Sequence, residues 1–276
     1  MCMSKTAVAV TLAGAALVVS PSIGAASPDS IAVEKAIRAL NAGKQAPADC
    51  KPAAAIIDEF APFSWDSFAT WTDALGKYNA QNAITDSKIS SPKFRHVNVE
   101  GTRAYAVVSV RFTYKQSGHA RSELATETWA LEKGASGWCS KSFAWFSKAG
   151  VDGGADATAV GNAVAAFASM KPGDAPPPTA ITDEFSPYLW QGASAAADWG
   201  AGLQKSMTAD HDTGLTLGLS DPSHLSVNGD KAYAVYPTTL TYSHKGEPMK
   251  EPGAFAFVLD KSSGTWRITS WAWATQ

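Results

Sequence analysis

The feature that most constrains this chain is a stretch that occurs twice. Residues 57–65 read Ile-Asp-Glu-Phe-Ala-Pro-Phe-Ser-Trp, and residues 182–190 read Thr-Asp-Glu-Phe-Ser-Pro-Tyr-Leu-Trp. An acidic pair, an aromatic residue, a proline, a second aromatic residue and a tryptophan in one order are too specific to arise from composition alone. We therefore interpret the chain as a tandem duplication, with one domain over residues 27–149 and a second over residues 150–276.

The tryptophans support this alignment. Four pairs occupy matching places in the two copies: Trp65 with Trp190, Trp71 with Trp199, Trp138 with Trp266, and Trp145 with Trp273. From Trp71 and Trp199 onward the two copies stay in step at a separation of 128 residues. A tryptophan buries roughly 150–250 Å², so matched tryptophans predict that the two copies fill the same core.

Hydrophobic periodicity predicts the same order of elements in each copy. Apolar residues at helical spacing indicate first helices near residues 30–43 and 158–170, and second helices over about 67–84 and 193–209. The rest of each copy alternates at period two and is broken by glycine turns, which is typical of an antiparallel sheet. The predicted fold class is therefore α+β in both copies.

Within the repeated stretch, alternation predicts a strand that places Asp58 and Asp183 on the apolar face, while Glu59 and Glu184 point to water. A carboxylate among apolar neighbours is disfavoured as the ion, which raises its pKa unless hydrogen bonds compensate. Asp58 and Asp183 are therefore the catalytic candidates, each as a general base, and also candidates for a polar contact to a ligand. In the alternative interpretation, they hold backbone amides of the following loop.

Residues 1–26 have the anatomy of a secretory signal, with Lys5 before an apolar run too short to span a bilayer and small residues before a cleavage point after Ala26. This predicts a periplasmic or secreted protein that has no membrane attachment after cleavage. The formal net charge is −2, or −3 once Lys5 is removed. This balance, without a basic run, argues against nucleic acid as a partner.

Two cysteines, Cys50 and Cys139, remain after the signal, and both lie in the first copy. In an oxidising compartment we expect such a pair to form a disulfide. Two cysteines alone do not supply a metal site. None of the five histidines has metal-ligand spacing, so we expect neither a metal nor another cofactor.

The order of elements and the last strand, Gly264-Thr-Trp266-Arg-Ile268-Thr-Ser-Trp271-Ala-Trp273, resemble the nuclear transport factor 2-like superfamily, in particular its SnoaL-like bacterial members. The resemblance covers nearly the whole chain after the signal, once per copy. It implies a strongly bent sheet that wraps the helices into a cone with an apolar pocket, and dimerisation through the outer sheet face. A tandem copy would build that dimer within one chain, as a monomeric pseudo-dimer.

The superfamily includes ketosteroid isomerases, polyketide cyclases and epoxide hydrolases, which use a carboxylate in the cone. The present sequence departs from them, because neither first helix carries the tyrosine of the isomerases and no Asp-Arg-Asp relay is found. The candidate ligand-binding residues are Trp65, Trp71, Tyr105, Glu127, Trp190, Trp199 and Tyr233. Glu127 stands where the second copy has Phe255, and we expect Glu127 to be solvated.

These observations favour an exported module that binds a small apolar ligand or a protein. One alternative is an isomerase, cyclase or hydratase with an aspartate in the cone as general base. The other is a scaffold in which the two cones serve only assembly.

Overall fold

The computed structural model describes residues 27–44, 49–50, 55–148, 150–152, 154–169, 178–261 and 264–276. The signal peptide predicted for residues 1–26 lies outside these ranges. In the described part of the chain, no helix is both long and apolar enough to cross a membrane.

The first copy is a six-stranded curved sheet covered on one side by two helices, α1 (Pro28–Asn41) and α2 (Phe68–Gln81). The strands follow the sheet order β2-β1-β6-β5-β4-β3. Their bounds are β1 Ala55–Ile57, β2 Ser64–Trp65, β3 Ile84–Glu100, β4 Arg103–Gln116, β5 His119–Lys133 and β6 Trp138–Phe146. β1 pairs with β6 in parallel, and the other neighbours are antiparallel.

The second copy repeats this arrangement with an eight-stranded sheet. Its helices are α3 (Ala157–Ala168), which follows the short 3-10 helix η1 (Gly154–Asp156), and α4 (Ala195–Asp210). The strands are β7 Gly150–Asp152, β8 Ala180–Thr182, β9 Leu189–Gln191, β10 Asp212–Leu219, β11 His224–Asn228, β12 Lys231–His244, β13 Glu247–Asp260 and β14 Arg267–Thr275. β10 and β11 together occupy the place of β3, and both pair with β12. The α+β class predicted from the sequence is confirmed in both copies.

The repeated stretch is not one strand, as its alternation predicted, but a strand, a turn and a second short strand. β1 ends at Ile57, a cis peptide precedes Pro62, and the amide of Asp58 donates to the carbonyl of Phe63 at 3.1 Å. Proline has no amide hydrogen to donate to a ladder, which is why the strand cannot continue through it. Glu59 lies beyond the end of β1, so the alternation of side chains along a strand does not apply to it. Glu59 and its counterpart Glu184 are half-buried, which corrects the prediction that both point to water.

The two helices of the first copy each begin with a serine whose side chain caps the helix. The side chain of Ser67 accepts a hydrogen bond from the amide of Thr70 at the start of α2, which begins close to its predicted position. α1 begins earlier than predicted, because Ser27, and not Ser30, accepts the capping bond.

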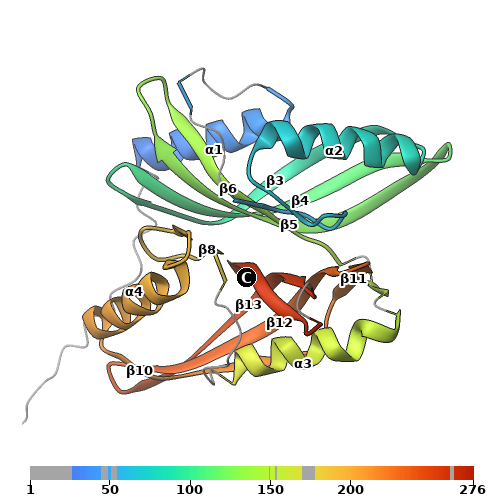
Figure 1. Ribbon diagram of the computed structural model, residues 1–276. Helices are drawn as coiled ribbons and strands as arrows, with labels where there is room; N and C mark the ends of the chain where they lie inside the picture. Colours follow the sequence, from blue (N-terminus) through green and yellow to red (C-terminus); the bar gives the residue numbers. More distant parts are fainter. Residues whose placement is uncertain are drawn as a thin grey trace, which may run out of the picture.

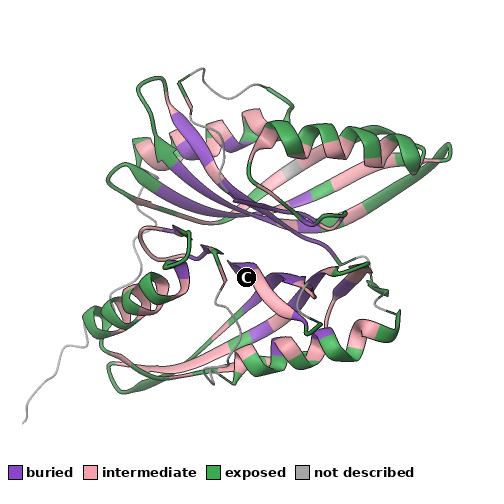
Figure 2. Cartoon of the chain, in the orientation of Figure 1, coloured by how far each residue is buried: buried purple, intermediate pink, exposed green. Residues whose placement is uncertain are grey.

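The two sheets lie between the helices, so that the layers run helix, sheet, sheet, helix (Figure 1). Both faces of the central strands are therefore buried, as the purple strands in Figure 2 show. Along β4, Ala104 and Ala106 pack toward α1, whereas Tyr105 and Val107 pack against the other copy. We call the space between the helices and the sheet of each copy the first cone and the second cone.

The contact between the sheets is reciprocal. The hydroxyl of Tyr105 donates to the backbone carbonyl of Trp273 at 2.6 Å, and the hydroxyl of Tyr233 donates to the carbonyl of Trp145. Tyr233 and Trp273 are the counterparts of Tyr105 and Trp145 at the 128-residue separation. Such a swapped pair of contacts is what a two-fold interface between identical subunits would contain.

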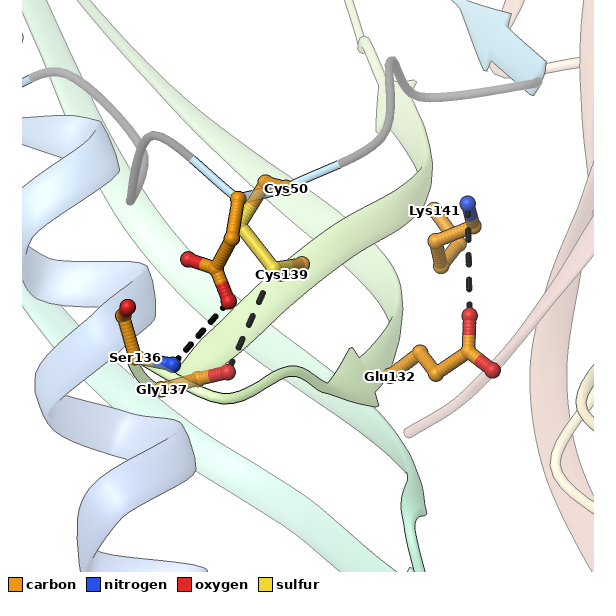
Figure 3. Close-up of a disulfide and its surroundings, with 7 residues drawn as sticks. Cys50, Glu132, Ser136, Gly137, Cys139 and Lys141 are labelled. Carbon is orange, nitrogen blue, oxygen red and sulfur yellow. Dashed lines mark hydrogen bonds and ion pairs between the residues drawn. A yellow bond between two sulfur atoms is a disulfide. The ribbon is translucent and has the colours of Figure 1, made fainter.

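The predicted disulfide between Cys50 and Cys139 is confirmed (Figure 3). It joins the segment between α1 and β1 to the first residues of β6, with the two Cα atoms 5.3 Å apart. Beside it, a carboxylate oxygen of Asp49 accepts a hydrogen bond from the amide of Ser136 at 3.0 Å. The bridge therefore fixes this segment to the β5–β6 turn.

Candidate functional site

The aspartate of each repeated stretch makes the same two hydrogen bonds. In the first copy, Asp58 accepts from the amide of Glu59 at 2.7 Å and from the indole of Trp71 at 2.8 Å. In the second copy, Asp183 accepts from the amide of Glu184 at 2.8 Å and from the indole of Trp199 at 2.8 Å. Each aspartate therefore joins the second helix of its copy to the end of the first strand.

Both aspartates are buried, with exposed fractions of 7 % for Asp58 and 8 % for Asp183. Burial is the main cause that raises the pKa of Asp58 to about 6 and that of Asp183 to about 7, and the hydrogen bonds from the indole and the amide oppose this rise. Each aspartate therefore holds one backbone amide, as the alternative interpretation expected, and the role of either as a general base stays a prediction. What separates the two copies is the space around the aspartate.

The second copy forms a partly open cavity of about 940 Å³ that reaches Asp183. Its apolar wall comes from α3, α4 and the sheet: Phe167, Trp199, Leu203, Leu217, Leu240, Phe255, Trp271 and Trp273. Strand β3 of the first copy adds His96, Asn98 and Glu100. The cavity therefore belongs to the second cone but is completed by the first copy.

Two differences between α2 and α4 explain why the second cone holds this space. In the first cone, Phe68 stacks on Trp129 with ring centroids 6.1 Å apart, and Tyr78 stacks on Phe60 at 5.0 Å. Phe68 and Ala196 each lie three residues before the matched tryptophans Trp71 and Trp199 of α2 and α4, and Tyr78 corresponds to Ser206 at the 128-residue separation. Both Ala196 and Ser206 line the cavity. The alignment of the two copies already showed aromatic residues replaced by small ones at these positions. A cavity could not be predicted from this change, because the sequence alone does not show that both positions face the cone.

Glu127 is fully buried in the first cone, which corrects the expectation that it is solvated. One carboxylate oxygen accepts from the amide group of Asn41 at 2.8 Å and from the indole of Trp129 at 3.0 Å, while the other has no partner among the described residues. Glu127 and Trp129 are two residues apart on β5, so their side chains lie on the same face of the sheet. This face is turned toward the helices, and Glu127 therefore does not face the solvent. Burial raises the pKa of Glu127 to about 7.

Sequence reasoning missed a third carboxyl group in each copy. Glu251 on β13 lines the cavity together with Asp183 and Glu184, and the hydroxyl of Thr275 contacts a carboxylate oxygen of Glu184 and one of Glu251, the latter at 3.2 Å. Thr275 therefore brings the carboxyl groups of Glu184 and Glu251 close together on the cavity wall. The counterpart of Glu251 is Glu123, a match that the alignment offered but that no motif marked.

The carboxyl groups of the cavity raise each other's pKa. Burial is the first cause for Glu251, whose pKa is raised to about 7, and the charge of Glu184 is the second. For Glu184, burial and then the charge of Asp183 raise the pKa. The cavity therefore holds acids that change protonation near neutral pH.

The remaining predicted residues lie elsewhere. Tyr105 and Tyr233 are fully buried between the sheets and do not line the cavity. Side chains alternate between the two faces of a strand, and these two tyrosines lie on the face that is turned away from the cones. Trp190 packs on Phe185, with ring centroids 4.8 Å apart, and is not part of the cavity lining. Trp65 lines a separate groove of about 520 Å³ between the copies. Of the seven candidate ligand-binding residues, only Trp199 lines the large cavity.

Two histidines at matching positions also occupy the region between the copies. The rings of His96 and His224 lie 6.0 Å from Tyr105 and 5.3 Å from Tyr233, respectively. Neither ring nitrogen of His224 has a hydrogen-bond partner among the described residues, and burial lowers the pKa of both histidines. In the described ranges, no three or more histidine, cysteine or carboxylate side chains are grouped so as to hold a metal ion.

Comparison with known proteins gives similarity at the level of structure. No protein-family model matches the chain, and no curated protein sequence matches it. Similar solved structures include a ketosteroid isomerase-like protein from Erwinia carotovora atroseptica, with 14 % identity and a TM-score of 0.33, covering 44 % of this chain and 97 % of that one.

A nuclear transport factor 2-like protein with a cystatin-like fold from Novosphingobium aromaticivorans has 18 % identity and a TM-score of 0.30, covering 42 % of this chain and 71 % of that one. A nuclear transport factor 2-like superfamily protein from Salmonella enterica serovar Typhimurium has 19 % identity and a TM-score of 0.31, covering 43 % of this chain and 81 % of that one. The chain is similar to these proteins in fold, as helices on a curved antiparallel sheet.

Proposed function

We propose that the protein is an exported module that binds a small, mostly apolar ligand in the second cone. The observation that carries this proposal is the cavity of about 940 Å³. Ligand sites in proteins are typically concave and apolar, with a few polar groups that orient the ligand. The aromatic wall around Trp199, with Asp183 and Glu251 among the polar groups, has this composition.

Export to a periplasmic or extracellular compartment is part of the proposal. It is supported by the disulfide between Cys50 and Cys139, because such bonds persist in oxidising compartments. The first cone has a different role in this proposal. Its interior is occupied by the rings of Phe68, Trp71, Trp129 and Phe143, which contact one another, so it serves as a filled partner that completes the second cone.

The direct test is to give α4 the side chains of α2. The double substitution Ala196→Phe and Ser206→Tyr places two rings in the cavity, and Ala201→Phe adds a ring at an exposed position of the same helix. Native mass spectrometry of gently purified protein should detect a bound small molecule in the unmodified chain and in Ala201→Phe. The double variant should lose it. Retention of the molecule by the folded double variant would show that the second cone is not the site.

A general-base enzyme is the second candidate, and one observation favours it. Asp183 lines the cavity, and the rise of its pKa to about 7 leaves the carboxylate both available and basic near neutral pH. The bound molecule, once released and identified, should then be converted when it is incubated with the protein. Asp183→Asn should abolish the conversion. A ligand that stays chemically unchanged would leave the binding module as the function.

A further inference from the structure

We infer that the ligand of the second cone is a hydrophobic amine, with an apolar body and a protonated nitrogen. This inference rests on the proposed function of the cavity and adds the chemical class of the ligand. It is carried by the charges that surround an otherwise apolar space.

The polar lining of the cavity is strongly acidic. The carboxyl groups that line it are those of Glu100, Asp183, Glu184, Asp210, Asp212 and Glu251. The basic side chains among the lining residues are Lys205, which is exposed on α4, and His96. Burial lowers the pKa of His96, so its ring is neutral near pH 7. Asp212 already has a partner, because Nδ1 of His244 lies 2.8 Å from its carboxylate. The lining thus still offers several acidic groups and little positive charge of its own.

These carboxyl groups extend from the interior of the cavity to its exposed rim. Asp183 is buried beside Trp199, Glu184 and Glu251 are half-buried, and Asp210 is exposed at the end of α4. A ligand can therefore place its nitrogen among the half-buried acids while its apolar body contacts the aromatic wall. The opposite orientation would put an apolar body among carboxylates.

The hydrogen-bonding capacity of the acids also selects a donor. Each carboxylate oxygen of Asp183 accepts one bond, from the amide of Glu184 or the indole of Trp199, and a carboxylate oxygen can accept a second. Glu184 and Glu251 share the single hydroxyl of Thr275. Glu184 also interacts with the side chains of Glu251 and Trp273. An ammonium group has only donors, so it can donate to the carboxylate oxygens of these acids that can accept a further bond.

The protein's own acids would gain from such a ligand. At present Glu184 raises the pKa of Glu251, and Asp183 raises that of Glu184, because like charges close together are unfavourable. A cation placed between them removes this repulsion and forms charge-assisted hydrogen bonds. The ring of Trp199, which is half-buried and lines the cavity, can add cation–π attraction. A neutral hydroxyl group can still donate one hydrogen bond to a carboxylate, but it carries no charge that offsets the repulsion between the acids, and an anion is repelled.

The test compares three probes that share one apolar cage and differ in the head group: 1-adamantylamine, 1-adamantanol and 1-adamantanecarboxylate. Titration calorimetry with the full exported chain, freed of any bound molecule, should show that the amine binds at least ~10-fold more tightly than the alcohol, with the carboxylate weakest. Equal affinity for amine and alcohol, or tighter binding of the carboxylate, would overturn the inference but leave a binding cavity. If none of the probes binds, both the inference and the proposed function fail.

A matched pair of variants locates the effect. Glu251→Gln should reduce the preference for the amine over the alcohol, whereas Glu123→Gln changes the equivalent residue of the first copy and should leave it unchanged. The preference is the ratio of the affinities for the amine and the alcohol, both measured on the same variant. A general loss of stability would weaken both affinities and would not by itself change their ratio. An unchanged ratio in Glu251→Gln would show that the acids of the cavity do not select the ligand.

Discussion

Replacing Glu127 with glutamine should stabilise the protein at alkaline pH and leave its stability nearly unchanged at acid pH. The reason lies in how the buried carboxyl group is held. Asn41 and Trp129 both donate to the same carboxylate oxygen, at 2.8 Å and 3.0 Å. The amide oxygen of a glutamine can accept both bonds, and its NH₂ group then takes the place of the oxygen that has no partner among the described residues. Glutamine thus reproduces the protonated form of Glu127.

The magnitude follows from the pKa of Glu127, which burial raises from a usual value of 4.5 to about 7. Below pH 4.5 the carboxyl group is protonated in both the folded and the unfolded chain. As the pH rises, the unfolded chain releases its proton first, so the free energy of unfolding falls until the folded chain titrates near pH 7. Each pKa unit is worth about 1.4 kcal/mol, so the variant should gain up to about 3 kcal/mol above that pH.

The assay is urea denaturation of the unmodified chain and of Glu127→Gln at about pH 4 and about pH 9, where the difference in unfolding free energy should be near zero and about 3 kcal/mol, respectively. Glu132→Gln is the control, because the side chain of Glu132 lies on the same strand and is 51 % exposed. Its effect should be small at both pH values. A Glu127→Gln variant that is equally or less stable than the unmodified chain at about pH 9 would refute the reasoning.

Two further predictions concern the covalent and the interfacial contacts. Replacing both Cys50 and Cys139 with alanine removes a link across a sequence separation of 89 residues. Loop-closure entropy predicts that the free energy of unfolding falls by about 4–5 kcal/mol. Guanidinium denaturation measures this loss, and a loss below about 1 kcal/mol would contradict the entropic account. Tyr233→Phe removes the buried hydrogen bond to the carbonyl of Trp145 and should cost about 1–2 kcal/mol in the same assay. Tyr188→Phe is its matched control, because the buried hydroxyl of Tyr188 has no partner among the described residues. The first copy has Phe63 at the matching position. A Tyr188→Phe variant that loses as much stability as Tyr233→Phe would show that the interfacial hydrogen bond contributes little.

Local patterns in the sequence were enough to predict the architecture of each copy. Apolar residues at helical spacing predicted α1, in which Val33 and Ile37 are buried. Glycine turns were predicted in the sheet, and Gly101 and Gly118 have positive φ at two of them. The disulfide between Cys50 and Cys139 was predicted because two cysteines remain after the predicted signal peptide and the expected compartment is oxidising. These features depend on short-range geometry or on pairing within a small set, so the sequence contains the information directly.

The repeated stretch shows where such patterns fail. Alternation predicted one strand through Asp58 and Glu59, but β1 ends at Ile57, and a turn that contains Pro62 follows. Glu59 lies in this turn and is half-buried. The hydrogen bond from Trp71 to Asp58 could not be foreseen either. It joins a helix to a strand end, and their approach is decided by how the whole copy packs.

The location of the site was decided only by the tertiary structure. Period two shows that Tyr105 and Ala106 lie on opposite faces of β4, but it does not say which face is the cone, because both faces of this sheet are buried. For the same reason Glu127 could not be assigned to the interior, and the change from Phe68 to Ala196 could not be read as a cavity. The sequence by itself determined a duplicated α+β chain with one disulfide. Which copy is filled and which is open depends on side chains that meet across elements far apart in the chain.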